Sequence, residues 1–179
     1  MENRPVTTDD LKQFIRDIPD FPTPGIIFKD ITPLLADPDA FSQSVKLLAE
    51  RLDAAGAHEI LAIESRGFIF GAAVSAEMSI PLHLVRKSGK LPGETVGMDY
   101  DLEYGTDRIE IQSGVLRPGT RYGIVDDLIA TGGTAAATVR LAQSYDADIA
   151  CCSFLIELSF LRGRDKLNGC RVESLLTYD

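Results

Sequence analysis

The chain has 179 residues, of which 45% are hydrophobic and 25% are charged. This is an ordinary globular composition, and it fits one domain without disulfides. The net charge of −9 argues against a nonspecific nucleic-acid binder, which requires a basic face. The N-terminus has no signal-peptide pattern, and no run approaches about 18 apolar residues. We therefore expect no membrane contact and a cytoplasmic location.

The cysteines and histidines argue against two kinds of site. The chain has an odd number of cysteines, and two of the three are adjacent in an apolar run: Cys151, Cys152 and Cys170. This pattern predicts reduced, buried thiols instead of a disulfide framework. His58 and His83 lie far apart without cysteine neighbours, so we expect no zinc site.

The N-terminal part combines helical and extended segments. Residues 7–18 begin with a capping box and carry apolar residues at i, i+3, i+4 and i+7, which predicts an amphipathic helix. Residues 19–33 contain four of the nine prolines and are expected to form an ordered, extended loop. A second helix is predicted from Asp37 to Leu52, with Gly56 beyond its end.

From residue 59 onward, strands and helices alternate, which implies a mostly parallel sheet flanked by helices, an α/β fold. The interval 86–107 is rich in glycine, lysine and acids and is expected to be a long flexible loop. The predicted strands cover residues 59–63, 81–85, 108–111, 124–125, 149–156 and 171–176, and the predicted helices cover residues 67–78 and the segment from residue 134.

Residues 122–134, with the sequence YGIVDDLIATGGT, are the most informative segment. A short apolar strand ends in Asp126 and Asp127, and small residues then begin a helix. Open α/β sheets bind ligands at the carboxyl ends of their strands. Here the free backbone N–H groups of Gly132 and Gly133, the hydroxyls of Thr131 and Thr134 and the helix N-terminus suit a phosphate, while two carboxylates suit vicinal hydroxyls or Mg²⁺. The segment predicts a ribose-phosphate site.

Other interpretations of this segment explain less. A plain strand–turn–helix accounts for the glycines but not for the paired acids. The chain has no Gly-x-x-x-x-Gly-Lys, so the segment is not a Walker loop. It also has no Gly-x-Gly-x-x-Gly, so nicotinamide or flavin binding has no support.

Two further segments place cations where an anion could bind. Residues 64–68 (ESRGF) form a βα turn with Arg66 at a helix N-terminus. Such an arginine is more often solvated, but the ribose-phosphate loop on the same sheet edge favours function. Residues 86–93 (RKSGKLPG) carry Arg86, Lys87 and Lys90 at a strand end. A solvated basic loop is the alternative, yet cations beside a pyrophosphate leaving group would stabilise the transition state.

The 122–134 segment resembles the phosphoribosyl-pyrophosphate motif of the type I phosphoribosyltransferases: an apolar strand, two acids, two apolar residues and a small-residue Thr-Gly loop. The resemblance extends in order over nearly the whole chain. It implies a type I phosphoribosyltransferase fold over residues 1–179, with a hood (1–35) above the base site and a flexible lid loop (86–107). The segments that are closely similar to family members acting on adenine are residues 21–33, 64–70, 86–93, 101–105 and 156–158.

The resemblance implies transfer of the 5-phosphoribosyl group from phosphoribosyl pyrophosphate to adenine, giving AMP and pyrophosphate in purine salvage. Mg²⁺ would bind through the substrate pyrophosphate and water, with no protein-built metal cage. The resemblance also implies a homodimer. A cis peptide bond is expected between Glu64 and Ser65, where it would turn successive N–H groups toward pyrophosphate.

Each matching residue receives a role from the resemblance. Asp126 and Asp127 would hold the ribose hydroxyls. The 5′-phosphate would lie against Ala130, Thr131, Gly132, Gly133 and Thr134. Pyrophosphate would be held by Ser65, Arg66, Arg86, Lys87 and Lys90. Adenine would stack on Phe28, be read by the backbone of Ile27 and Lys29, and be closed in by Leu158. The catalytic residues would be Glu103 and Tyr104, in the lid.

Base choice is indicated at one position of the motif. Relatives acting on hypoxanthine or guanine typically carry an Asp where this chain has Ala130, and that acid handles the purine proton. A methyl group cannot, so Glu103 is the expected acceptor. The departures from the family are mild: Lys29 stands where many relatives carry Arg, and residues 98–101 are more acidic than usual.

Three other functions fit parts of the pattern. A phosphoribosyltransferase for orotate or xanthine would use the same ribose-phosphate motif. A non-catalytic regulator would keep the fold as a ribose-phosphate sensor, but such regulators usually append a DNA-binding module, for which 179 residues leave no room. A phosphoribosyl-pyrophosphate synthetase shares a similar acidic motif but needs a much longer chain.

Overall fold

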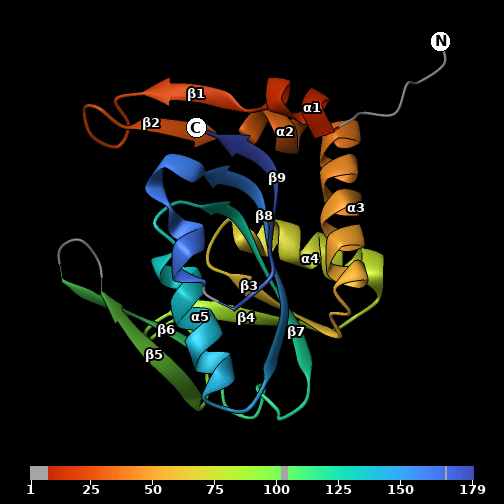
Figure 1. Cartoon of the computed structure of the whole chain (residues 1–179), viewed down its shortest axis with the longest axis vertical. Helices are drawn as coiled ribbons and strands as arrows, with labels where there is room; N and C mark the ends of the chain where they lie inside the picture. The colour runs from red at the N-terminus through yellow and green to blue at the C-terminus, as the bar shows by residue number, and fades with distance from the viewer. Residues whose placement is uncertain (1–7, 102–104, 168) are drawn as a thin grey trace.

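A seven-stranded sheet forms the centre of the computed structural model, which describes residues 8–101, 105–167 and 169–179 (Figure 1). Its strands are β3 (Glu59–Ile63), β4 (Leu82–Lys87), β5 (Thr95–Asp101), β6 (Thr106–Gln112), β7 (Arg121–Ile129), β8 (Asp148–Leu158) and β9 (Val172–Tyr178). Their order is β5-β6-β4-β3-β7-β8-β9. The neighbouring strands β4, β3, β7, β8 and β9 pair in parallel. At the β4 side, β6 and β5 add an antiparallel edge. The expected mostly parallel α/β sheet is confirmed.

Helices cover both faces of this sheet (Figure 1). The helices α3 (Pro38–Ala54) and α4 (Gly67–Met78) lie on one face, and α5 (Gly133–Gln143) lies on the other. Along β3, the side chain of Ile60 joins the core beneath α3 and α4, whereas Leu61 joins the core beneath α5. A strand buried on both faces has a continuous apolar sequence, which is why β3 was recognisable. Within the described ranges, none of the helices has the length and apolarity to cross a bilayer.

Residues 8–36 form a layer above the sheet, seen at the top of Figure 1. The predicted helix over residues 7–18 is wrong beyond Phe14, because Arg16 to Pro19 pair with a second strand from Asp30 back to Ile27. The pairing and a 2.6 Å contact between the Arg16 guanidinium and the Asp30 carboxylate outweigh the helical pattern. The elements of this layer are α1 (Thr8–Leu11), a 3₁₀ turn η1 (Lys12–Phe14), β1 (Arg16–Pro19), β2 (Ile27–Asp30) and α2 (Thr32–Ala36).

The structure differs from the expected loop over residues 86–107. β4 continues to Lys87, and β5 pairs with β6 as an antiparallel ribbon. Val96 and Met98 pack on the core beneath α5, and Tyr100 is buried in it. This period of two is the strand signal, and the intervening glycine and acids concealed it. A role of this ribbon as a lid stays a prediction.

The chain reverses its direction across the sheet between β3 and β7. After β3 the chain passes through α4 to β4 on one side, whereas β7 pairs with β3 on the other side. Ligands bind at such a switch point, outside the carboxyl ends of the strands. The turn that begins at Glu64 and the loop that begins at Ala130 both leave this edge.

Candidate active site at the carboxyl edge of the sheet

The paired acids lie inside β7, which runs past them to Ile129 instead of ending before them. Asp126 Oδ1 accepts a hydrogen bond from the backbone N–H of Asp127 at 2.8 Å. Asp127 is only 4% exposed. Its Oδ2 atom lies 2.9 Å from Arg66 Nη2 but accepts no well-directed hydrogen bond from it. A buried carboxylate oxygen is therefore ready to accept a hydrogen bond from a ligand.

Burial and mutual repulsion control the ionisation of this pair. Burial raises the pKa of Asp126 well above its usual range, and the neighbouring Asp127 charge raises it further. Burial also raises the pKa of Asp127, although the Arg66 guanidinium opposes that change. The pair therefore carries unfavourable charge that donors from a ligand would relieve.

The loop after β7 lines a cavity of about 130 Å³. Gly132 has φ +73°, a left-handed conformation, and a Cβ there would collide with the carbonyl oxygen of Gly163. Gly163 begins η3 (Gly163–Lys166), which follows η2 (Ser159–Leu161) after β8. The loop is thus shaped by close backbone packing and lies at the N-terminus of α5, a position that suits a phosphate. The cavity is lined by Asp126 and by residues 128–135.

Tyr100 connects the start of α5, next to the 130–133 loop, to the β5–β6 ribbon. Its hydroxyl accepts a hydrogen bond from Thr134 Oγ1 at 3.2 Å and donates to Asp107 Oδ2 at 3.1 Å. The Lys87 ammonium lies 2.8 Å from the same Asp107 oxygen. This hydrogen bond from Lys87 lowers the pKa of Asp107, and the Asp107 carboxylate raises the pKa of Lys87. Neither Tyr100 nor Asp107 was predicted, because only tertiary pairing brings them to α5.

The turn after β3 brings the base segment and the ribose segment together. The Glu64–Ser65 peptide bond is cis, as predicted, and Ser65 is exposed. The Arg66 guanidinium lies 4.9 Å from the centre of the Phe28 ring while it also contacts Asp127. Three segments that are far apart in the sequence therefore meet around one arginine.

Glu64 contacts three of the residues that are predicted to bind pyrophosphate. Its carboxylate accepts hydrogen bonds from Arg86 Nε at 3.1 Å and from the backbone N–H of Lys87 at 3.0 Å, and it forms an ion pair with Lys90. Burial raises the pKa of Glu64, but the hydrogen bonds from Lys90, Lys87 and Arg86 outweigh it, so the pKa is lowered. Glu64 lies in the motif that the sequence singled out, yet no role was assigned to it.

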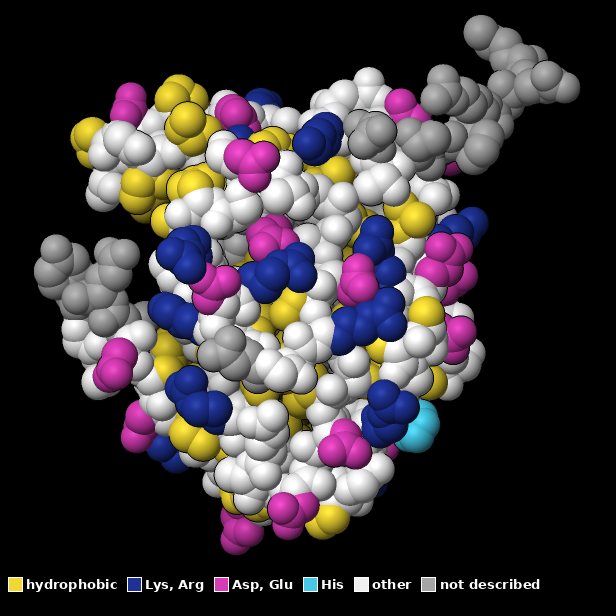
Figure 2. Space-filling model, viewed as in Figure 1, with side chains coloured by type: hydrophobic (Ala, Val, Ile, Leu, Met, Phe, Trp, Pro, Cys, Tyr) yellow, Lys and Arg dark blue, Asp and Glu magenta, His cyan; other side chains and the backbone are white. Residues whose placement is uncertain are grey.

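The predicted base-binding residues divide between the hairpin and the core. The Lys29 ammonium lies 2.7 Å from Asp17 and 4.0 Å from the centre of the Tyr178 ring. Leu158 is partly buried against the core beneath α3 and α4. Figure 2 shows apolar side chains gathered over the β1–β2 hairpin, where Ile27 is 55% exposed. Glu103 and Tyr104 lie outside the described residues.

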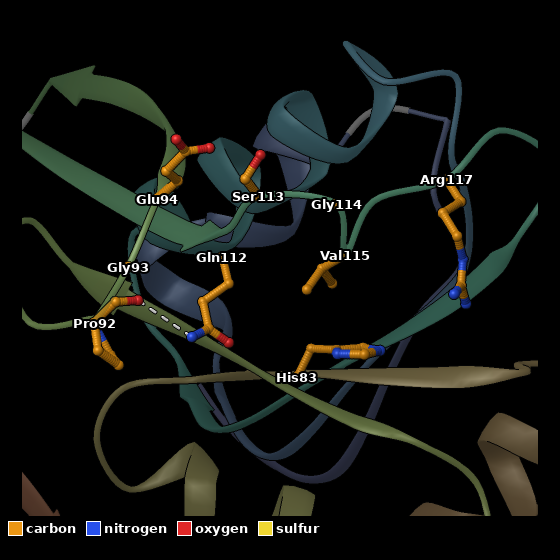
Figure 3. A pocket seen from close by; sticks show the side chains of 9 residues that line it. All are labelled: His83, Pro92, Gly93, Glu94, Gln112, Ser113, Gly114, Val115 and Arg117. Carbon is orange, nitrogen blue, oxygen red and sulfur yellow. Dashed lines mark hydrogen bonds between the residues drawn. The ribbon is translucent and has the colours of Figure 1, made fainter.

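A larger cavity of about 560 Å³ lies away from this chemistry (Figure 3). It is lined by His83 near the start of β4, by Gln112 at the end of β6, and by Arg117 before β7. Glu59 binds both His83, at 2.7 Å, and Arg117. These residues lie toward the amino ends of the parallel strands, so the cavity is not part of the candidate site.

Comparisons with known proteins agree with this geometry. A family model described as "Phosphoribosyl transferase domain" matches residues 33–167. The adenine phosphoribosyltransferase of Carboxydothermus hydrogenoformans is 51% identical over 94% of this chain and 99% of its own length. That of Novosphingobium aromaticivorans is 49% identical over 97% of this chain and 98% of its own.

Two solved structures are similar over nearly the whole chain. The adenine phosphoribosyltransferase of Thermoanaerobacter pseudethanolicus has a TM-score of 0.92 and 46% identity, covering 96% of this chain and 100% of its own. The Saccharomyces cerevisiae enzyme, complexed with an imino-altritol bisphosphate and adenine, has a TM-score of 0.89 and 38% identity over 94% and 97% of the two chains. The fold and site define a type I phosphoribosyltransferase. Within that class, the chain belongs to the adenine phosphoribosyltransferase family.

Proposed function

We propose that this protein transfers the 5-phosphoribosyl group of phosphoribosyl pyrophosphate to adenine, giving AMP and pyrophosphate in purine salvage. The observation that carries this proposal is the paired-acid strand and glycine loop at the switch point of the sheet. It stands in a chain that is 51% identical to an adenine phosphoribosyltransferase over 94% of its length.

The ribose phosphate fits the β7 strand and its loop. Asp126 and Asp127 would accept hydrogen bonds from the ribose hydroxyls, and this would relieve the repulsion within the acid pair. The backbone N–H groups of residues 130–134 would donate to the 5′-phosphate at the start of α5. Two carboxylates beside the anomeric carbon also favour the positive charge that develops there, as in glycoside cleavage.

Pyrophosphate fits the cations opposite this loop. Arg66 and Arg86 offer forked donors, while Lys87 and Lys90 offer compact ammonium groups. All four are paired with acids in this structure, two of them with Glu64. Charge grows on pyrophosphate as its bond to ribose breaks, so these cations would bind the transition state more strongly than the substrate.

Adenine would stack on Phe28, whose ring already lies against Arg66 and, edge to face, 5.3 Å from Phe21. The Lys29 ammonium is engaged by Asp17 and the Tyr178 ring, so the backbone of Lys29 and Ile27 would read the base. The N9 atom would attack the anomeric carbon. Glu103 would accept the proton from N7, and Tyr104 would cover the reacting centre.

The residues present fit a Mg²⁺ ion that enters with pyrophosphate. The buried Asp127 Oδ2 lacks a well-directed hydrogen bond, so a water of a hydrated cation or a ribose hydroxyl can donate to it. When bound, Mg²⁺ would neutralise part of the pyrophosphate charge.

A homodimer and a cytoplasmic location are part of the proposal. Leu82 packs toward α4, so Leu84, two residues further on β4, faces the same side. Leu84 on β4, the strand that also carries Arg86, and Ile69 on α4 are each 39% exposed. This apolar surface supports a contact with a second copy. Light scattering at micromolar concentration is expected to give twice the chain mass, and a monomer would contradict the dimer.

The three free cysteines support the proposed cytoplasmic location, because the cytoplasm is a reducing compartment.

A pyrophosphate-release assay with a panel of bases tests the proposed reaction. Adenine should be the preferred acceptor, whereas hypoxanthine, guanine, xanthine and orotate should react weakly. Little or no turnover of adenine beside good turnover of another base would replace the substrate assignment. Binding of phosphoribosyl pyrophosphate without turnover of any base would instead support a sensor.

A further inference from the structure

A second cavity, of about 510 Å³, lies at the amino edge of the sheet, opposite the candidate active site. Arg121 and Asp148, the first residues of β7 and β8, form part of its wall. Cys170, which precedes β9, lines the cavity beside Gly169. The proposed reaction uses none of these groups.

Cys170 forms a pair with a buried thiol. It is partly exposed and packs against the core beneath α5, and Cys152 on β8 is a fully buried member of that core. The backbone holds this pair in place, because Cys152 N–H donates to Arg171 O at 2.8 Å and Cys170 N–H donates to Leu167 O at 3.0 Å. The Cys170 sulfur is therefore accessible from the cavity, and the Cys152 thiol is buried in the adjacent core.

Cys170 is also the thiol that ionises most readily. The hydrogen bond from Cys152 favours the Cys170 thiolate and lowers the Cys170 pKa to about 7. The same hydrogen bond and burial raise the pKa of Cys152. Burial raises the pKa of Cys151 to about 11. Of the charged groups on the cavity wall, Arg121 favours the thiolate, and Asp148 opposes it.

We propose that Cys170 is a peroxide-reactive thiol with Cys152 as its resolving partner, so that hydrogen peroxide converts the pair into an intramolecular disulfide. The Cys170 thiolate would attack one peroxide oxygen, the O–O bond would break, and the sulfenic acid and hydroxide would form. Cys152 would then attack the Cys170 sulfur, losing its proton, and the sulfenic oxygen would leave as water. Two electrons pass from the two thiols to the peroxide.

The test treats the native protein with stoichiometric hydrogen peroxide and maps its peptides by mass spectrometry without reduction. We expect one cross-link that joins Cys152 to Cys170. The matched control is Cys151→Ser, because Cys151 is adjacent and equally buried but belongs to the other core. This variant should form the cross-link at the wild-type rate, and Cys170→Ser should not form it. Oxidation of Cys151 at the rate of Cys170, or sulfinic acid at Cys170 without the cross-link, would overturn the proposal.

The pH dependence of alkylation provides a second test on the unoxidised protein. Half-maximal reaction of Cys170 with iodoacetamide is expected near pH 7. In Cys152→Ala the donor is lost, so the midpoint should move up toward about 8.5, the ordinary thiol value. A wild-type midpoint already at the ordinary value would show that the thiol pair does not activate Cys170, and the proposal would fail even if the variant does not fold.

Discussion

Glu64 has an unusual place for an acid in a site that is proposed to bind pyrophosphate. It contacts Arg86, Lys90 and the backbone of Lys87, three residues that are proposed to bind pyrophosphate. A carboxylate in this position keeps the cations together when no substrate is bound. It also competes with pyrophosphate for them, so its charge should weaken the binding of that anion.

We therefore expect Glu64→Gln to bind inorganic pyrophosphate several-fold more tightly than the wild type. Glutamine can keep a hydrogen bond to Arg86 but removes the competing charge. Titration calorimetry measures the change. Glu110→Gln is the matched control, because Glu110 lies on β6 opposite Arg86 but accepts hydrogen bonds from the Ser88 hydroxyl and the Gly89 N–H instead. Weaker binding by Glu64→Gln alone would mean that Glu64 chiefly positions the cations.

Glu103 is the residue on which the chemical step depends in the proposed mechanism. Glu103→Ala should lower kcat by roughly 10²–10⁴-fold, the usual range for a general acid or base, with little change in the binding of phosphoribosyl pyrophosphate. Steady-state kinetics and direct binding measure the two quantities. Glu103→Gln can still accept a hydrogen bond from N7 but cannot take its proton. Nearly full activity in that variant would make Glu103 a positioning residue.

At the scale of elements, the sequence predicted best where one periodic pattern decided the structure. β3 and α4 have their predicted bounds, since β3 is a buried apolar strand, α4 is a helix rich in small and apolar residues, and both have clear end signals. β1 was missed because its pairing with β2 overrides a helical pattern, and β5 was missed because glycine and acidic residues interrupt its alternating apolar residues. The site followed the same rule. The sequence located Asp126 and Arg66 by motif, but the contact of Tyr100 with α5 depends on the β5–β6 ribbon.

The loop at residues 130–134, the proposed 5′-phosphate site, offers a test at this scale through its two adjacent glycines. Gly132→Ala should lower the free energy of unfolding by at least about 1 kcal/mol, because alanine disfavours a positive φ and its methyl group would collide with Gly163. It should also weaken phosphoribosyl-pyrophosphate binding. Gly133→Ala is the matched control, since a Cβ there would lie 3.5 Å from the Tyr100 ring, an ordinary contact. Chemical denaturation and KM compare the two variants, and equal losses would contradict this account of the loop.

At the scale of the whole molecule, the site is a set of paired charges on an acidic protein. The net charge is −9, and on the face drawn in Figure 2 basic and acidic side chains lie next to one another. Most shifted carboxylates are stabilised by partners: hydrogen bonds from Arg164 lower the pKa of Glu157, and hydrogen bonds from Ser88 and Gly89 lower that of Glu110. The pKa of Asp126 is shifted in the opposite direction, because burial and the neighbouring Asp127 raise it, a pattern typical of functional sites.

The raised pKa of Asp126 predicts how the stability of the protein depends on pH. A carboxyl group whose pKa is raised by folding opposes folding above its unfolded pKa, and the penalty disappears as pH falls below that value. Asp126→Asn removes the charge but keeps an oxygen for the Asp127 N–H. The variant should therefore melt a few degrees above the wild type at pH 7, where about 1 kcal/mol corresponds to roughly 2–4 °C for a chain of this size. The advantage should vanish near pH 4, where the unfolded carboxyl becomes protonated. Asp53→Asn, on the exposed side of α3, is the control and should shift the melting temperature little at either pH.

Phosphoribosyl transfer by Asp126→Asn should fall at least tenfold, since a ribose acceptor is lost. Lower stability at pH 7, or unchanged kinetics, would show that Asp126 is not a strained ribose ligand.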